Sequence, residues 1–199
     1  MSTRTRLSPE QRRAQLLDLG VQLLAEAGLE DLSTDLLAEH AGISRGLLYH
    51  YFSNKRDFHL AVLRRMADEV VAITAPTGVG SPLDQMQTSL EAYVDFVAAN
   101  RDSYVAFVRA AAGGDESYHR IYEDSRRVLT DRIFDPAYSD FLSSVGLRDD
   151  ARSRLIVRGW SAMVEEMVLS WLERPESMNR DQLLSLLTTA LPAVAAASG

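Results

Sequence analysis

Apolar residues recur at intervals of three and four positions along almost the whole chain, the spacing of a helix with one buried face. Leu16, Leu19, Leu23 and Leu24 form the first such stripe. No segment shows the apolar-polar alternation of a half-buried β-strand, and no internal repeat occurs. The pattern predicts an all-α protein of about nine helices.

Capping residues bound the helices at the start of the chain. Ser8, Ser33, Ser44 and Asn54 are placed as N-caps, because their side-chain oxygens can accept from the first unbonded N–H groups of a helix. Glycines that tolerate the left-handed conformation are placed to end the first two helices. The expected ranges are 9–28, 34–41, 45–52 and 55–74.

The later helices are longer and more apolar. Residues 75–80, Ala-Pro-Thr-Gly-Val-Gly, form the clearest linker. Asp135-Pro136 should kink or break the helix before it, since proline disfavours helical geometry in the preceding residue. The expected ranges after the linker are 82–97, 101–112, 116–134, 150–172 and 180–191.

Residues 41–55, AGISRGLLYHYFSNK, combine a tight turn with many polar and aromatic side chains. Gly42-Ile43-Ser44 joins two short helices, which is typical of a helix-turn-helix unit. The second helix of such a unit enters the major groove of DNA and presents its N-terminal residues to the bases. We therefore expect the helix that starts at Arg45 to read DNA, with Ile43 and Leu48 facing inward.

The polar residues of this segment have chemistry suited to DNA. Ser44 leaves backbone N–H groups at a helix start, where an anion is favoured, and Arg45 can fork onto guanine or phosphate. Gly46 has no side chain and permits close approach. Lys55 lies in the first turn of the next helix, where the helix dipole disfavours a cation unless a phosphate binds there. Three side chains carry hydrogen-bonding tips on flat rings: Tyr49, His50 and Tyr51.

Three stretches share a recognisable arrangement: AEAG at 25–28, LAEHAGIS at 37–44 and RGLLYHYFSNK at 45–55. In these stretches residues 10–60 resemble the DNA-binding domain of TetR-family transcriptional regulators. The resemblance implies contacts to the DNA backbone from Ser33 or Thr34, Tyr49 and Lys55. It implies base contacts from Arg45, Gly46, His50 and Tyr51.

Two positions depart from the family pattern. Asp35 and Leu36 stand in the second helix where family members usually carry polar or basic residues. Because DNA repels a carboxylate, we expect Asp35 to be a partner of the helix dipole only, and not to read a base. Basic residues near the N-terminus are candidates for phosphate or minor-groove contacts: Arg4, Arg6, Arg12 and Arg13.

Charge and composition narrow the function. The net charge of −7 argues against a general binder of polyanions, yet residues 1–56 are neutral, with seven basic and seven acidic residues. The chain has no cysteine, which excludes a disulfide framework and a cysteine nucleophile. The histidines lack metal-ligand spacing and the common catalytic motifs are missing, so we expect no metal, no cofactor and no enzyme. With no signal peptide and no membrane span, the simplest expectation is a cytoplasmic protein.

Residues 1–56 suffice for a helix-turn-helix DNA-binding domain, which leaves 57–199 as a helical domain. Pockets between bundled helices commonly bind small molecules, and the resemblance implies a ligand-binding and dimerisation domain there. Arg126, if it points inward, would favour an anionic group of an apolar or amphipathic ligand. The candidate pocket residues, which can equally form dry core, are Met66, Tyr93, Phe107, Tyr118, Tyr122, Arg126, Trp160, Met163 and Met167.

The last two helices carry long apolar faces that suit a homodimer. Their members are Ile156, Trp160, Met163, Val164, Met167, Trp171, Leu183, Leu187 and Leu191. A dimer would place two reading helices one turn of DNA apart, on a palindromic operator. We expect a repressor that a ligand releases from double-stranded DNA. Activation stays open, as does an all-helical small-molecule-binding protein or enzyme with an incidental match.

Overall fold

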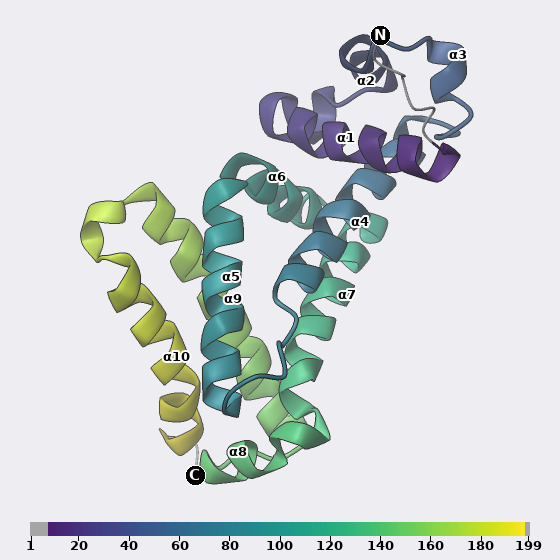
Figure 1. The fold of residues 1–199 in the computed structure, drawn as a ribbon. Coiled ribbons are helices and arrows are strands. Elements are labelled where there is room, and N and C mark those ends of the chain that lie inside the picture. Colours follow the sequence, from purple (N-terminus) through teal and green to yellow (C-terminus); the bar gives the residue numbers. More distant parts are fainter. Residues whose placement is uncertain (1–7, 198–199) are drawn as a thin grey trace, which may run out of the picture. The chain divides into compact units, whose positions relative to one another are not determined.

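A computed structural model describes residues 8–197, all of whose regular structure is helical (Figure 1). The α-helices of this range are α1 (Pro9–Asp31), α2 (Thr34–Ala41), α3 (Arg45–Leu48), α4 (Lys55–Ile73), α5 (Pro82–Ala99), α6 (Arg101–Ala112), α7 (Glu116–Asp131), α8 (Ser139–Ser144), α9 (Ala151–Glu173) and α10 (Arg180–Ala197). Short 3-10 helices lie at Arg132–Phe134, Pro136–Tyr138 and Pro175–Ser177. The all-α expectation is confirmed.

The predicted caps are present. The Ser8 side chain accepts from the Gln11 backbone N–H, and the Gln11 side chain reciprocates. Ser33 and Ser44 accept in the same way at the starts of α2 and α3. Gly42 follows α2 in the left-handed conformation with φ of 62°, which a residue with a Cβ adopts less readily.

Three local expectations are corrected. α3 is one turn long and ends at Leu48, not at residue 52, because Phe52 folds back into the core against the Phe58 ring, 5.1 Å away. Gly28 interrupts α1 with a positive φ of 71°, as predicted, but a further helical stretch follows it to Asp31. α8 was not predicted, since its six residues are too short to show a helical period.

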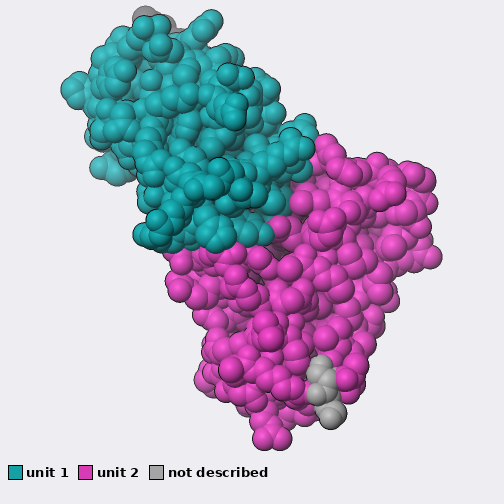
Figure 2. Space-filling model, turned by 180° about the vertical axis from the view of Figure 1, so that it is seen from behind, with its two compact units in different colours: residues 1–68, 102–122 teal, residues 69–101, 123–199 magenta. Residues whose placement is uncertain are grey.

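The chain divides into two compact units, coloured separately in Figure 2. Unit 1 comprises residues 1–68 and 102–122, and unit 2 comprises 69–101 and 123–199. α4 and α7 therefore each begin in unit 1 and end in unit 2. The predicted domain boundary after residue 56 is a linear division of the chain and stays a prediction.

In unit 1, α1 packs against α2 and α4. Leu24, Leu37 and Phe58 are fully buried among these helices. Gly20 marks the closest approach, because a Cβ at this position would lie 2.7 Å from Cγ2 of Val62. An ion pair between Arg65 and Asp18 of 2.9 Å joins α4 to α1 at the surface.

In unit 2, α5, α9 and α10 pack together (Figure 1). Trp160 of α9 donates its indole N–H to the Leu187 carbonyl of α10 at 3.0 Å. Leu183, Leu187 and Leu191 are fully buried. The apolar face predicted for dimerisation is thus mostly the internal seam of α9 and α10. No helix within residues 8–197 combines the length and apolar character needed to cross a bilayer.

Candidate nucleic-acid interface and ligand domain

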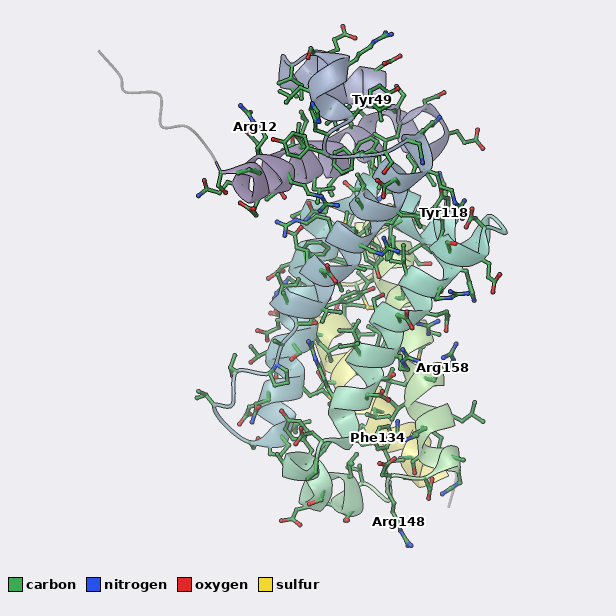
Figure 3. All side chains as sticks on the ribbon, turned by 90° about the vertical axis from the view of Figure 1, so that its right-hand side faces the viewer. Arg12, Tyr49, Tyr118, Phe134, Arg148 and Arg158 are labelled. Atoms are coloured by element: carbon green, nitrogen blue, oxygen red, sulfur yellow. The ribbon has the colours of Figure 1, made fainter. Side chains whose placement is uncertain are left out.

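The helix-turn-helix segment presents mainly polar side chains to solvent, beside Leu47, which is 39% exposed. Leu48 is buried and anchors α3, so the residues around it turn outward. Arg45, Gly46 and His50 are exposed, and the Tyr49 side chain is 57% exposed (Figure 3). Tyr51 is half-buried. The exposed residues therefore lie on both sides of the buried Leu48 in the sequence.

Arg45 and Asp35 form an ion pair on this surface. Nε of Arg45 lies 2.8 Å from Oδ1 of Asp35, and both side chains are more than half exposed. Asp35 is in the first turn of α2, so the expected dipole contact is present, but the expectation that this is its only partner is wrong. Sequence reasoning missed the pair because ten positions separate the residues.

Lys55 is held by the end of α1. Its ammonium donates to the Glu30 backbone carbonyl at 2.6 Å. Carbonyls at a helix C-terminus carry partial negative charge, so this contact offsets the unfavourable position of Lys55 at the start of α4. The ammonium has three donors, which leaves capacity for a phosphate.

A second polar cluster joins the start of α4 to the start of α7 within unit 1. Arg56 donates to both carboxylate oxygens of Asp115, with one distance of 3.1 Å, and to the Ser117 hydroxyl at 3.0 Å. The guanidinium lowers the pKa of Asp115 to about 2 by hydrogen bonding to its charged form. The sequence carries no local signal for a contact between residues so far apart.

His59 is the buried member of this cluster. Its Nε2 lies 2.6 Å from the Leu32 carbonyl, which can only accept, so Nε2 carries the proton in the neutral ring. The other nitrogen, Nδ1, then accepts from the Tyr118 hydroxyl at 3.2 Å (Figure 3 labels Tyr118). Burial lowers the pKa of His59, which favours this neutral form.

An open groove lies between the end of α1, α2 and the start of α3. Its volume is about 760 Å³. Three of the lining residues are acids, Asp31, Asp35 and Glu39, and Arg45 is the basic one. The three acids repel phosphate, whereas Arg45 and the helix starts at Ser33 and Ser44 favour it.

The remaining candidates for DNA contact have ordinary local roles. Ser33 and Ser44 are caps, and Thr34 begins α2. Arg12 donates to the Gln15 side chain at 2.8 Å (Figure 3), and Arg13 lies over the Phe52 ring at 5.4 Å. Arg4 and Arg6 lie outside the described residues.

The candidate ligand residues are divided between the two units. Unit 1 contains Met66, Phe107, Tyr118 and Tyr122, and unit 2 contains Tyr93, Arg126, Trp160, Met163 and Met167. Met66, Tyr93, Phe107 and Trp160 are buried, and the other five are half-buried. Whether any of them lines a pocket stays a prediction.

Arg126 has partners within unit 2. Its guanidinium lies 3.7 Å from Glu123 and 3.4 Å from the Arg158 carbonyl, and Glu123 also pairs with Arg158 (Figure 3). The side chain is only 15% exposed. Glu123 is shared by Arg126 and Arg158, so these three side chains keep a net positive formal charge, and the role of Arg126 toward an anionic ligand stays a prediction.

A helix-turn-helix segment with an exposed second helix on an all-α chain is typical of DNA-binding proteins. Comparison with known proteins agrees: residues 16–62 match the family model for bacterial regulatory proteins of the tetR family, and residues 82–194 match that for the tetracyclin repressor-like C-terminal domain. The chain belongs to the TetR family of transcriptional regulators, whose C-terminal domains bind ligands.

Individual relatives support this assignment. The transcriptional activator FasR of Mycolicibacterium smegmatis is 26% identical over 88% of this chain and 79% of its own length. A TetR-family regulator from Streptomyces coelicolor is 29% identical, with a TM-score of 0.76 over 97% of this chain and 85% of that one. FadR of Bacillus subtilis, solved with stearoyl-CoA, shares the fold at 15% identity, with a TM-score of 0.70 over 92% and 97% of the two chains.

Proposed function

We propose that this regulator binds a palindromic operator as a homodimer and leaves it when an apolar or amphipathic molecule binds the domain of residues 57–199. The observation that carries the DNA-reading part is the exposure of Arg45, Gly46, Tyr49 and His50 around the buried anchor Leu48. A helix start that projects from the protein in this way can enter the major groove of a DNA duplex and contact the base edges.

Contacts to the DNA follow from this surface. Arg45, Gly46 and His50 meet base edges, with Tyr51 beside them. The Ser33 or Thr34 end of α2, the Ser44 helix start, Tyr49 and Lys55 meet the sugar-phosphate backbone. Helix starts and the Lys55 ammonium suit phosphate oxygens, whereas the arginine fork suits guanine.

The proposed dimer uses the outer sides of α9 and α10. Leu155 is 71% exposed on α9, and Leu186 and Val194 are 42% and 44% exposed on α10. Gly159 and Ala162, also exposed on α9, allow close approach of a second helix. We propose these exposed residues as the dimer face, because most of the apolar face predicted from the sequence is buried within the subunit. Paired subunits would set two α3 helices about 34–36 Å apart.

Ligand control is proposed to act through α4, which runs from the helix-turn-helix segment into unit 2. A ligand that binds one separation of the two reading helices more tightly shifts the population toward it. A change in DNA affinity of tenfold to a hundredfold needs about 1.4–2.7 kcal/mol of coupling, which is common for allostery.

The test is footprinting of the purified protein on the DNA that flanks its own gene, over a range of salt concentrations. A protected palindrome whose binding falls steeply with salt supports the proposal, because phosphate contacts release counterions. The proposal is contradicted if no flanking segment is protected, or if salt does not weaken the binding. Stearoyl-CoA is a rational first ligand probe, since FadR shares the fold and was solved with it.

Activation is the second candidate, because FasR is described as an activator. Transcription from the footprinted promoter, measured in vitro with and without the protein, separates the two. Repression lowers transcript in the absence of ligand, and activation raises it.

A further inference from the structure

The Arg45–Asp35 pair joins the first residue of α3 to the first turn of α2. Its Nε–Oδ1 distance is 2.8 Å, with side chains 70% and 53% exposed. An ion pair this exposed contributes little to folding stability, because water screens both charges. Its main physical effect is to restrict where the guanidinium points.

The contact leaves a defined set of hydrogen-bonding groups. The closest approach in this ion pair is between Nε of Arg45 and Oδ1 of Asp35, and the two Nη groups of Arg45 remain available as a fork. The other carboxylate oxygen of Asp35, Oδ2, can accept a hydrogen bond. The pair therefore offers donors next to an acceptor on one exposed surface.

The major-groove edge of a G·C pair has the complementary arrangement. Guanine presents two acceptors, N7 and O6, and cytosine presents one donor, its N4 amino group. An A·T pair instead places thymine O4, an acceptor, where the carboxylate would meet it.

We propose that Asp35 and Arg45 read a G·C pair in each operator half-site as one unit, with Arg45 on guanine and Asp35 accepting from the cytosine paired with it or next to it. Asp35 is then a specificity-determining residue that also positions Arg45. The proposal rests on Arg45 as a base-reading residue, and it reverses the sequence-based expectation that Asp35 reads no base.

The test is selection of bound duplexes from a randomised DNA library by the full chain. The variants are Arg45→Ala, Asp35→Ala, which removes the acceptor, their combination, and Glu39→Gln as the control, since Glu39 is exposed on the same helix and its replacement removes the same charge. Thermal melting checks that each variant is folded.

We expect Arg45→Ala and Asp35→Ala to lower the preference for G·C at the same half-site position, each by about tenfold, the size of one base contact. The double variant should lose little more than either single variant, because the two residues act together. Glu39→Gln should keep the wild-type motif within about twofold.

A measurement on the DNA side does not depend on folding of a variant. Replacing the cytosine by N4-methylcytosine puts a methyl group in place of the major-groove hydrogen of the amino group and keeps the Watson–Crick pair, so wild-type binding should fall about fivefold while Asp35→Ala binding stays unchanged. If Asp35→Ala selects the wild-type motif although Arg45→Ala does not, the role of Asp35 is rejected and DNA reading by Arg45 stands. If the wild type enriches no motif, the proposed operator binding itself is rejected.

Discussion

The two cations of the helix-turn-helix segment are held by different partners. Arg45 meets a carboxylate on the neighbouring helix, whereas Lys55 meets the Glu30 carbonyl at the end of α1. A guanidinium fixed at Nε can still fork onto a base, and an ammonium on a carbonyl can still bind a phosphate. The residue types thus suggest a base contact for Arg45 and a phosphate contact for Lys55. The observed partners leave both contacts possible.

Substitution of these cations should separate specificity from general affinity. Arg45→Ala should weaken operator binding by 1–3 kcal/mol, about 5- to 150-fold, and relax base preference. Lys55→Ala should weaken binding to all sequences and reduce the salt slope by about one. Fluorescence anisotropy with operator and scrambled duplexes at several salt concentrations measures both. Equal loss on both duplexes for Arg45→Ala would contradict its role at a base.

His59 should make stability depend on pH. Burial lowers its pKa in the folded protein, so the unfolded chain takes up the proton first as pH falls. Its contribution is complete above the unfolded pKa of about 6.5 and declines as pH falls from there toward the folded value. Urea unfolding from pH 7.5 to 5.5 should show a steeper loss in wild type than in His59→Gln. His119→Gln, at an exposed histidine, should keep the wild-type slope.

At the scale of elements, three residues set the start, the burial and the end of α3. Ser44 starts it, the buried Leu48 anchors it, and the return of Phe52 to the core ends it after one turn. A helix this short keeps both its ends near the DNA-facing surface. Gly46 sits on the exposed side, where an added Cβ would meet nothing within 4 Å.

Gly46 and Gly20 form a contrasting pair of helix glycines. Gly46→Ala should leave stability unchanged or raise it by about 0.5 kcal/mol, since alanine favours helix, while DNA affinity falls by about tenfold because the Cβ occupies the approach of a base edge. Gly20→Ala should cost about 1–3 kcal/mol by overpacking against Val62. Thermal melts and operator titrations test both variants. Undiminished DNA binding by Gly46→Ala would show that α3 does not approach the duplex closely.

At the scale of the whole molecule, the packing units differ from a simple division of the chain. Residues 102–122 pack with the N-terminal segment, through contacts such as Arg56 with Asp115 and His59 with Tyr118. The start of α7 thereby shares a unit with the helix-turn-helix segment. A ligand that moves α7 could alter α4 through these contacts.

The proposed dimer face gives a prediction at this scale. Leu186→Glu should shift the protein to monomer in light scattering and abolish operator binding, because a carboxylate would be buried without a partner. Val128→Glu is the matched control, since Val128 on α7 is also 42% exposed. A dimer that survives Leu186→Glu while Val128→Glu dissociates it would move the interface to α7.

The sequence alone determined the helical class, most caps and the DNA-reading segment, because these depend on short-range spacing. Ser33, Gly42 and Ser44 act through neighbours within a few positions, and the apolar stripes need only a helical period. Tertiary structure alone decided that Asp35 holds Arg45, that Lys55 meets Glu30 and that Leu187 lies inside the seam of α9 and α10. The physical reason is that an apolar or charged side chain finds whichever partner packing brings near, and spacing along the chain does not specify that partner.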